Sequence, residues 1–274
     1  MKKTNDYDSV FKTLKTKHKR LFISVINETF HRNYPPDTEV TVISAEGFLT
    51  NNETEKGDTD ITERDTDFLI RLGNEVFLLE CQSFEDGTIA IRLAEYAFIT
   101  ARKFASWKNG SAIFPMPEFS VLYVKHTENT PKKTSITFTF PNGQEVVYEA
   151  DNILLEEFTR EYIVEKRLFP YIPFYIARYE KVLSGAGDIS DALSDLEYFR
   201  DELLKLFASG ELEYHELLDL MGFVNTIITH ITDGNAVEER LVKVMGGVVL
   251  ETESEKLIHA GEARGEARGE ARGE

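Results

Sequence analysis

Two acidic side chains fall at facing positions of a β-hairpin that the sequence predicts. The segments TDFLIRL (66–72) and EVFLLECQ (75–82) are rich in branched and aromatic residues, which favours strands. A single Gly-Asn pair separates them, and this pair favours a two-residue turn. Counting back from that turn, Asp67 faces Glu80. Like charges that face each other across a hairpin repel, and a divalent cation between the two carboxylates would offset the repulsion.

Side-chain alternation gives the hairpin one apolar face and one mixed face. The apolar face carries Phe68, Ile70, Leu72, Phe77, Leu79 and Cys81. The mixed face carries Leu69, Val76 and Leu78 near the turn, then Asp65, Asp67, Glu80 and Gln82 at the open end. Such a hairpin belongs inside a domain, with its open end at a cleft. Asp65 is an alternative first carboxylate, because it shares this face and lies opposite Gln82.

The donor types favour a hard cation. Mg²⁺ takes carboxylate oxygens and keeps several waters, so two carboxylates with a backbone carbonyl suit it, with Mn²⁺ as an alternative. Zinc is disfavoured, because no Cys/His spacing typical of a zinc site is present.

Several segments resemble those of one known family. They are an Asp on one strand with Glu-x-Gln on the next, the helix IRLAEYAF (91–98), the opening DSVFKTL (8–14) and the later LFPYIPFYIARYEKVL (168–183). Together they resemble the Rpn family of recombination-promoting nucleases and transposase-like proteins, within the PD-(D/E)XK nuclease superfamily. The resemblance covers most of residues 6–183. It implies a Mg²⁺-dependent DNA endonuclease with a restriction-endonuclease-like fold.

The resemblance also assigns roles to particular residues. It implies that Asp67 and Glu80 bind Mg²⁺, with the carbonyl of Cys81 as a third ligand. Gln82 then stands where the superfamily usually has lysine, and since Gln carries no charge it can only orient water or phosphate by hydrogen bonds. The reaction would be metal-assisted phosphodiester hydrolysis. Superfamily members often add an acid from the first helix, for which Glu28 is the candidate; the alternative is an exposed helix glutamate.

Arg92 and Tyr96 lie one turn apart on a helix predicted over 88–107. They are candidates for holding a substrate phosphate or orienting the metal ligands. The alternative is a structural Arg92 paired with Glu95 or Asp67. Trp107, at the predicted end of this helix, is interpreted as a core residue in preference to a platform for stacking bases.

Composition limits the possible partners. The chain has 274 residues, 42% of them hydrophobic, and a net charge of −17, which opposes DNA binding unless basic groups are concentrated locally. Residues 1–34 hold eight Lys or Arg against three acids, whereas 185–240 hold thirteen acids against three basic residues. The single Cys81, the absence of a signal-like stretch and the lack of a long apolar run favour a reducing cytoplasm without membrane insertion.

The order of the predicted elements favours an α/β fold. A helix over 8–30, strands over 40–49, 66–72, 75–82 and 119–126, a hairpin over 135–150, and helices over 153–168, 171–183, 189–208, 211–231 and 236–246 are predicted. We expect a restriction-endonuclease-like core of mixed sheet and helices in 1–150, a helical region in 151–250 and a low-complexity tail in 251–274. The tail repeats GEAR three times and predicts self-association through its small-residue stripes.

Other functions stay open at this point. The substrate could be RNA or a special DNA structure in place of ordinary DNA. The competing class is a decayed nuclease fold, whose acidic helical region and repeat tail bind proteins.

Overall fold

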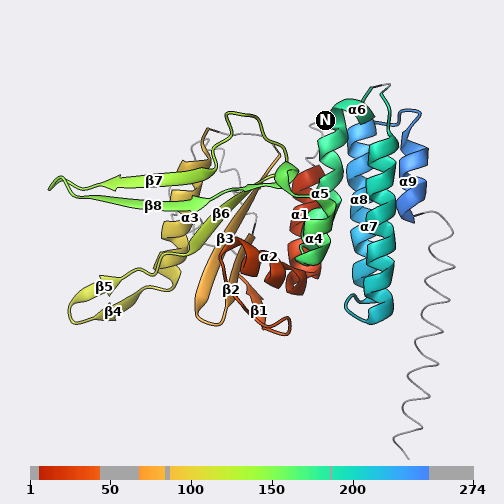
Figure 1. Cartoon of the computed structure of the whole chain (residues 1–274). Helices are drawn as coiled ribbons and strands as arrows, with labels where there is room; N and C mark the ends of the chain where they lie inside the picture. The colour runs from red at the N-terminus through yellow and green to blue at the C-terminus, as the bar shows by residue number, and fades with distance from the viewer. Residues whose placement is uncertain (1–5, 44–67, 84–86, 186, 247–274) are drawn as a thin grey trace, which may run out of the picture. The chain divides into compact units, whose positions relative to one another are not determined.

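The chain folds into two compact units, each with its own set of internal contacts. The computed structural model describes residues 6–43, 68–83, 87–185 and 187–246 (Figure 1). One unit, the α/β unit, is Phe11–Glu157; the other, the helical unit, joins residues up to Val10 to the chain from Phe158 onward. The GEAR repeats, and with them the predicted self-association, lie outside the described residues.

A five-stranded mixed sheet forms the centre of the α/β unit, in the order β1-β2-β3-β6-β9. β1, β2 and β3 are antiparallel neighbours, whereas β3, β6 and β9 run parallel. The crossover from β3 to β6 contains α3 (Ile89–Lys103), as parallel neighbours require. The strands are β1 (Val40–Val42), β2 (Phe68–Leu72), β3 (Glu75–Gln82), β6 (Glu118–Tyr123) and β9 (Ile153–Leu154). This confirms the predicted mixed α/β class.

The first hairpin has the predicted register. β2 and β3 pair from Leu72↔Glu75 through Phe68↔Leu79. Gly73 adopts a φ of +56° in the turn, a conformation that glycine tolerates better than other residues. The described pairing ends one residue short of the predicted pair Asp67 and Glu80, because Asp67 is outside the described residues.

Helices cover both faces of this hairpin. On one face Phe22, from α2 (Phe22–Thr29), lies 4.3 Å from Phe68 between ring centroids. On the other face Leu69 and Leu78 belong to a buried cluster that includes Leu93 and Tyr96 of α3. The strands are therefore apolar on both sides, as predicted near the turn.

The predicted helix over 8–30 is broken. α1 (Asp6–Lys17) is followed by a short 3-10 turn, η1 (Lys19–Leu21), and then by α2. In one straight helix Phe11 and Phe22 would be about 16 Å apart along the axis. Their rings lie 5.7 Å apart, and both contact Phe68. The break brings two apolar faces onto one strand.

Two further hairpins project from the sheet (Figure 1). They are β4 (Ser106–Lys108) with β5 (Ser111–Ile113), and β7 (Lys133–Thr139) with β8 (Glu145–Asp151). The second was predicted. The first was not, because the helix predicted over 88–107 ends at Lys103, and Trp107 is 75% exposed on β4. The interpretation of Trp107 as a core residue is therefore wrong.

The turn between β4 and β5 explains that difference. Asn109 and Gly110 both have positive φ, +52° and +79°. An Asn-Gly pair favours this turn and matches the twist of a hairpin. The local turn signal therefore outweighs the apolar periodicity that predicts a longer helix.

The helical unit contains most of the predicted C-terminal helices. Thr159 begins α4 (Arg160–Glu165) by accepting a hydrogen bond from the backbone N–H of Tyr162. The predicted segment 153–168 instead begins with strand β9. The helices are α4 (Arg160–Glu165), α5 (Ile172–Tyr175), α6 (Glu180–Leu183), α7 (Ser190–Ser209), α8 (Tyr214–Thr232) and α9 (Glu238–Gly246).

Candidate functional site

The side chain of Glu80 is buried near the end of β3, with only 2% of it exposed. Nη2 of Arg92, from the first turn of α3, lies 3.9 Å from Oε1 of Glu80. A carboxylate removed from water is costly unless a charged or hydrogen-bonding group compensates it. The guanidinium is such a group, and its own side chain is 26% exposed. The buried carboxylate of Glu80 on β3 and the partly exposed guanidinium of Arg92 on α3 thus lie close together.

The alternation of β3 explains why Glu80 is buried. Glu80 follows Leu78 on the face that packs against α3, and its neighbour across the parallel pairing is Val121 of β6. The side chain consequently enters the space beneath the helix. Arg92 therefore pairs with Glu80. Asp67, one of the partners predicted for Arg92, lies outside the described residues.

The two residues after Glu80 present different groups. Gln82 is half-buried, and its backbone carbonyl accepts a hydrogen bond of 2.9 Å from the N–H of Val124. Backbone groups alternate along a strand, so the carbonyl of Cys81 points to the other side of β3, where β2 pairs. The thiol of Cys81 is buried, and its side chain faces away from that of Glu80.

The remaining predicted residues have different settings. Tyr96 is only 6% exposed and belongs to the apolar cluster between α3 and the sheet. Glu28 is half-buried on α2, the helix that packs on the opposite face from Glu80. Asp67, and the alternative Asp65, lie outside the described residues. The structure therefore brings Glu80 and Arg92 together, with Tyr96 one turn further along α3.

A second group of ionisable residues lies at the opposite end of β3. Arg32 contacts Glu75 at 3.2 Å and also Glu118, at the start of β6. The hydroxyl of Tyr34 donates to the other oxygen of Glu75. These residues are far apart in sequence, so their spacing carries no signal that would have revealed the group.

Burial and hydrogen bonds shift the pKa values in this second group. The hydrogen bond from Tyr34, and then Arg32, lower the pKa of Glu75, although partial burial opposes them. Burial and the hydrogen bond to Glu75 raise the pKa of Tyr34 to about 12. Burial also raises the pKa of Glu118 despite the nearby guanidinium. The contacts attach the segment after α2 to the starts of two strands, which is a structural role.

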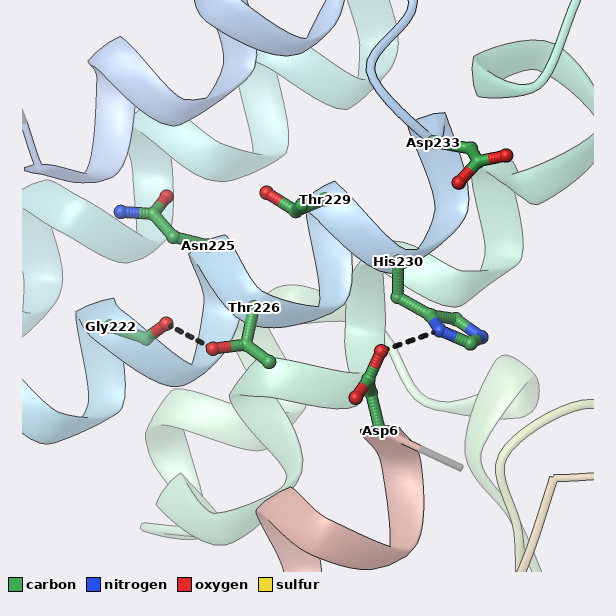
Figure 2. A pocket seen from close by; sticks show the side chains of 7 residues that line it. All are labelled: Asp6, Gly222, Asn225, Thr226, Thr229, His230 and Asp233. Atoms are coloured by element: carbon green, nitrogen blue, oxygen red, sulfur yellow. Dashed lines mark hydrogen bonds and ion pairs between the residues drawn. The ribbon is translucent and has the colours of Figure 1, made fainter. Parts of the chain in front are cut away.

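The helical unit contains a cavity of about 480 Å³ (Figure 2). Nδ1 of His230 and Oδ2 of Asp6 are 2.8 Å apart at its edge, and the ring of Tyr7 meets His230 edge-on. The cavity is lined by Asp6, Gly222, Asn225, Thr226, Thr229, His230 and Asp233. None of the described residues predicted for catalysis lines it. Its hydroxyl and amide groups lie along one side of α8 and form no recognisable catalytic arrangement.

In comparisons with known proteins, no family model matches this chain, and no curated protein or solved structure matches it. None of the helices in the described part of the chain has the length and hydropathy that crossing a lipid bilayer requires.

Proposed function

We propose that the protein is a Mg²⁺-dependent DNA endonuclease, and that Glu80 is the centre of its active site. The observation that carries the proposal is the buried carboxylate of Glu80 near the end of a central strand, with a guanidinium 3.9 Å away. A carboxylate buried on a central strand beside a partly exposed cation is a candidate to bind a metal or take part in catalysis.

The available donors fit a hard divalent cation. Glu80 offers carboxylate oxygens, and Cys81 offers a backbone carbonyl from the next position of the strand. Both are oxygen ligands of the kind that Mg²⁺ and Mn²⁺ prefer. In the proposal Asp67 completes this set from the facing strand. The described register of β2 and β3 supports that assignment up to the preceding pair, Phe68 and Leu79.

When bound, the cation would supply an activated water and neutralise charge on the phosphoryl oxygens. The chain's own groups would position the substrate. Gln82 has an amide that both donates and accepts hydrogen bonds, so it can orient the attacking water or a phosphate oxygen. Arg92, whose guanidinium is partly exposed, can bind a non-bridging phosphate oxygen while it also balances the charge of Glu80.

The strand order of the sheet supports our proposal that residues of this unit form a restriction-endonuclease-like core. Such a core is what the resemblance to the Rpn family implies. The antiparallel strands β1, β2 and β3 lead through α3 to the parallel strand β6, with helices on both faces. Glu80 belongs to the last strand before the crossover helix, and this is the strand to which the resemblance assigns the Glu-x-Gln triplet.

A plasmid-nicking assay tests the proposal. The full chain is incubated with supercoiled DNA and Mg²⁺, with and without EDTA, and compared with Glu80→Gln. This substitution keeps the volume of the side chain and removes its charge. Glu128→Gln is the matched control, because it makes the same change at an exposed loop position.

We expect metal-dependent nicking by the wild type and by Glu128→Gln, and a loss of at least about 100-fold in Glu80→Gln, the scale seen when one group that stabilises transition-state charge is removed. Circular dichroism should show that all three proteins are folded. Equal nicking rates for the wild type and Glu80→Gln would remove Glu80 from the mechanism.

A decayed nuclease fold that binds proteins is the second candidate. The observation that favours it is the Arg92–Glu80 ion pair itself, because a purely structural buried carboxylate needs such a partner. Isothermal titration calorimetry separates the two candidates. A Mg²⁺ or Mn²⁺ binding heat that is lost in Glu80→Gln supports the endonuclease, whereas an absence of heat in the wild type supports the decayed fold.

A further inference from the structure

The hairpin β4–β5 carries an unusually exposed aromatic side chain. Trp107 is 75% exposed, the largest value among the large apolar residues that the structure describes. Burial of an aromatic side chain is a major source of stability, so an exposed indole on an ordered hairpin contributes little to folding and is available to contact another molecule.

Local geometry keeps the indole uncovered. The pairing of β4 with β5 sets Trp107 opposite Ala112, whose methyl group covers little of a neighbouring ring. The positive φ angles of Asn109 and Gly110 fix a tight turn one residue beyond Trp107. The indole is therefore presented by a short two-stranded ribbon.

The charge of the chain segment that contains this hairpin differs from that of the whole chain. The net charge of the chain is −17, yet the segment between Glu95 and Glu118 contains three basic residues and no acidic residue. These basic residues, Arg102, Lys103 and Lys108, are all exposed. A basic segment with an exposed aromatic ring complements a phosphate backbone with accessible bases, which is how proteins bind single-stranded nucleic acid.

Helix α3 connects the hairpin to the proposed active site along the chain. Arg92 lies in the first turn of α3, and β4 begins three residues after this helix ends. From Arg92 to the end of α3 the axial rise is about 16 Å, or about five base steps at 3.4 Å each. A strand of DNA with its phosphate at Arg92 could therefore reach the hairpin within a few nucleotides.

We propose that β4–β5 is a DNA-binding arm, in which Trp107 stacks on an unpaired base and Lys108 contacts the adjoining phosphates. The inference rests on the proposed function and deepens it, because it names DNA with a single-stranded segment as the substrate class. Ring stacking requires an accessible base face, which a fully paired duplex does not offer.

The chain provides its own probe for this contact, because Trp107 is its only tryptophan. Intrinsic fluorescence is measured on the full chain with Glu80→Gln, so that the DNA is not cleaved. A short single-stranded DNA oligonucleotide of mixed sequence is then added, and a duplex of the same sequence is added in parallel. We expect strong quenching by the single strand and at least about tenfold weaker binding of the duplex, the ratio that a loss of about 1.4 kcal/mol produces.

Variants measured by fluorescence anisotropy of a labelled oligonucleotide complete the test. Trp107→Ala should weaken binding about 5- to 150-fold, and Trp107→Phe should retain most of the affinity. Lys108→Gln should reduce the slope of log affinity against log salt by about 0.7, as expected for one phosphate contact to a single strand. Phe140→Ala is the matched control, because it removes a ring that is 48% exposed on the other hairpin, and it should leave binding unchanged.

The outcomes separate this inference from the proposed nuclease activity. Quenching with a Trp107-dependent affinity supports the arm even if no nicking is detected. Unchanged fluorescence and equal affinity in Trp107→Ala refute the arm while leaving nicking that depends on Glu80 intact. Equal binding of duplex and single strand overturns the single-stranded preference. A fluorescence change that follows protein concentration alone would assign the hairpin to contact between two copies and refute the proposal.

Discussion

Removing the guanidinium of Arg92 should expose the electrostatic cost of burying Glu80. At 3.9 Å two unit charges attract by about 4 kcal/mol at an effective dielectric constant of 20. Because the Arg92 side chain is 26% exposed and the pair lies beyond hydrogen-bonding distance, we reduce this to about 2 kcal/mol. Arg92→Met keeps much of the stem of the side chain and leaves the buried carboxylate in place. It should therefore lower the free energy of unfolding by about 2–3 kcal/mol.

A double-mutant cycle isolates the interaction between the two charges. Urea unfolding in EDTA is followed by circular dichroism for Arg92→Met, Glu80→Gln and the double variant. The double variant should lose about 2 kcal/mol less than the sum of the two single losses, because it lacks both charges of the pair. Additive losses within about 0.5 kcal/mol would show that the ion pair does not stabilise the buried carboxylate, and would refute this reasoning.

The same variants connect the ion pair to the proposed cation. If Glu80 binds Mg²⁺, Arg92→Met should be stabilised by added Mg²⁺ more than the wild type is, since the Arg92 guanidinium no longer competes for the carboxylate. A ligand that binds only the folded state, present at a free concentration 100 times its Kd, raises the free energy of unfolding by about 2.7 kcal/mol. Urea unfolding in Mg²⁺ and in EDTA can therefore measure this difference in the free energy of unfolding.

Two further predictions concern positions outside the proposed site. The pKa of Tyr34 is raised to about 12, first by burial and then by its hydrogen bond to Glu75, so its contribution to stability should be present below pH 10 and be lost as the pH rises through 12. Absorbance titration should show one fewer late-ionising tyrosine in Tyr34→Phe; an identical titration would contradict the assignment. Gly73→Ala should cost about 1 kcal/mol in urea unfolding, because φ there is +56° although a methyl group would meet no atom within 4 Å. Gly87→Ala, also without a neighbour within 4 Å but without a positive φ, is its control and should be nearly neutral; equal losses would mean that backbone strain is not the cause.

Short-range signals predicted the central hairpin accurately. The two-residue separation and the alternation of apolar residues fixed the register that β2 and β3 adopt. The same rules applied to Asn109 and Gly110 would have predicted β4–β5. There the apolar spacing of the preceding helix was extended too far, so Trp107 was placed in the core.

Contacts between distant segments could not be predicted from one sequence. Arg32, Glu75 and Glu118 meet because β3 and β6 are parallel neighbours and the segment after α2 reaches their starts. Likewise the ion pair of Glu80 with Arg92 depends on how α3 lies on the sheet, although both residues were singled out as site candidates. The pairing of Asp67 with Glu80, and with it the complete metal site, stays a prediction.

The short strand β9 has a practical consequence for dividing the chain. Ile153 and Leu154 pair with Leu122 and Tyr123 and so cover one side of β6. A fragment truncated at residue 150 would lack this pairing and leave backbone donors and acceptors of β6 open to other molecules, a known cause of aggregation. Expression of the α/β unit alone should therefore extend through Glu157, where its contacts end.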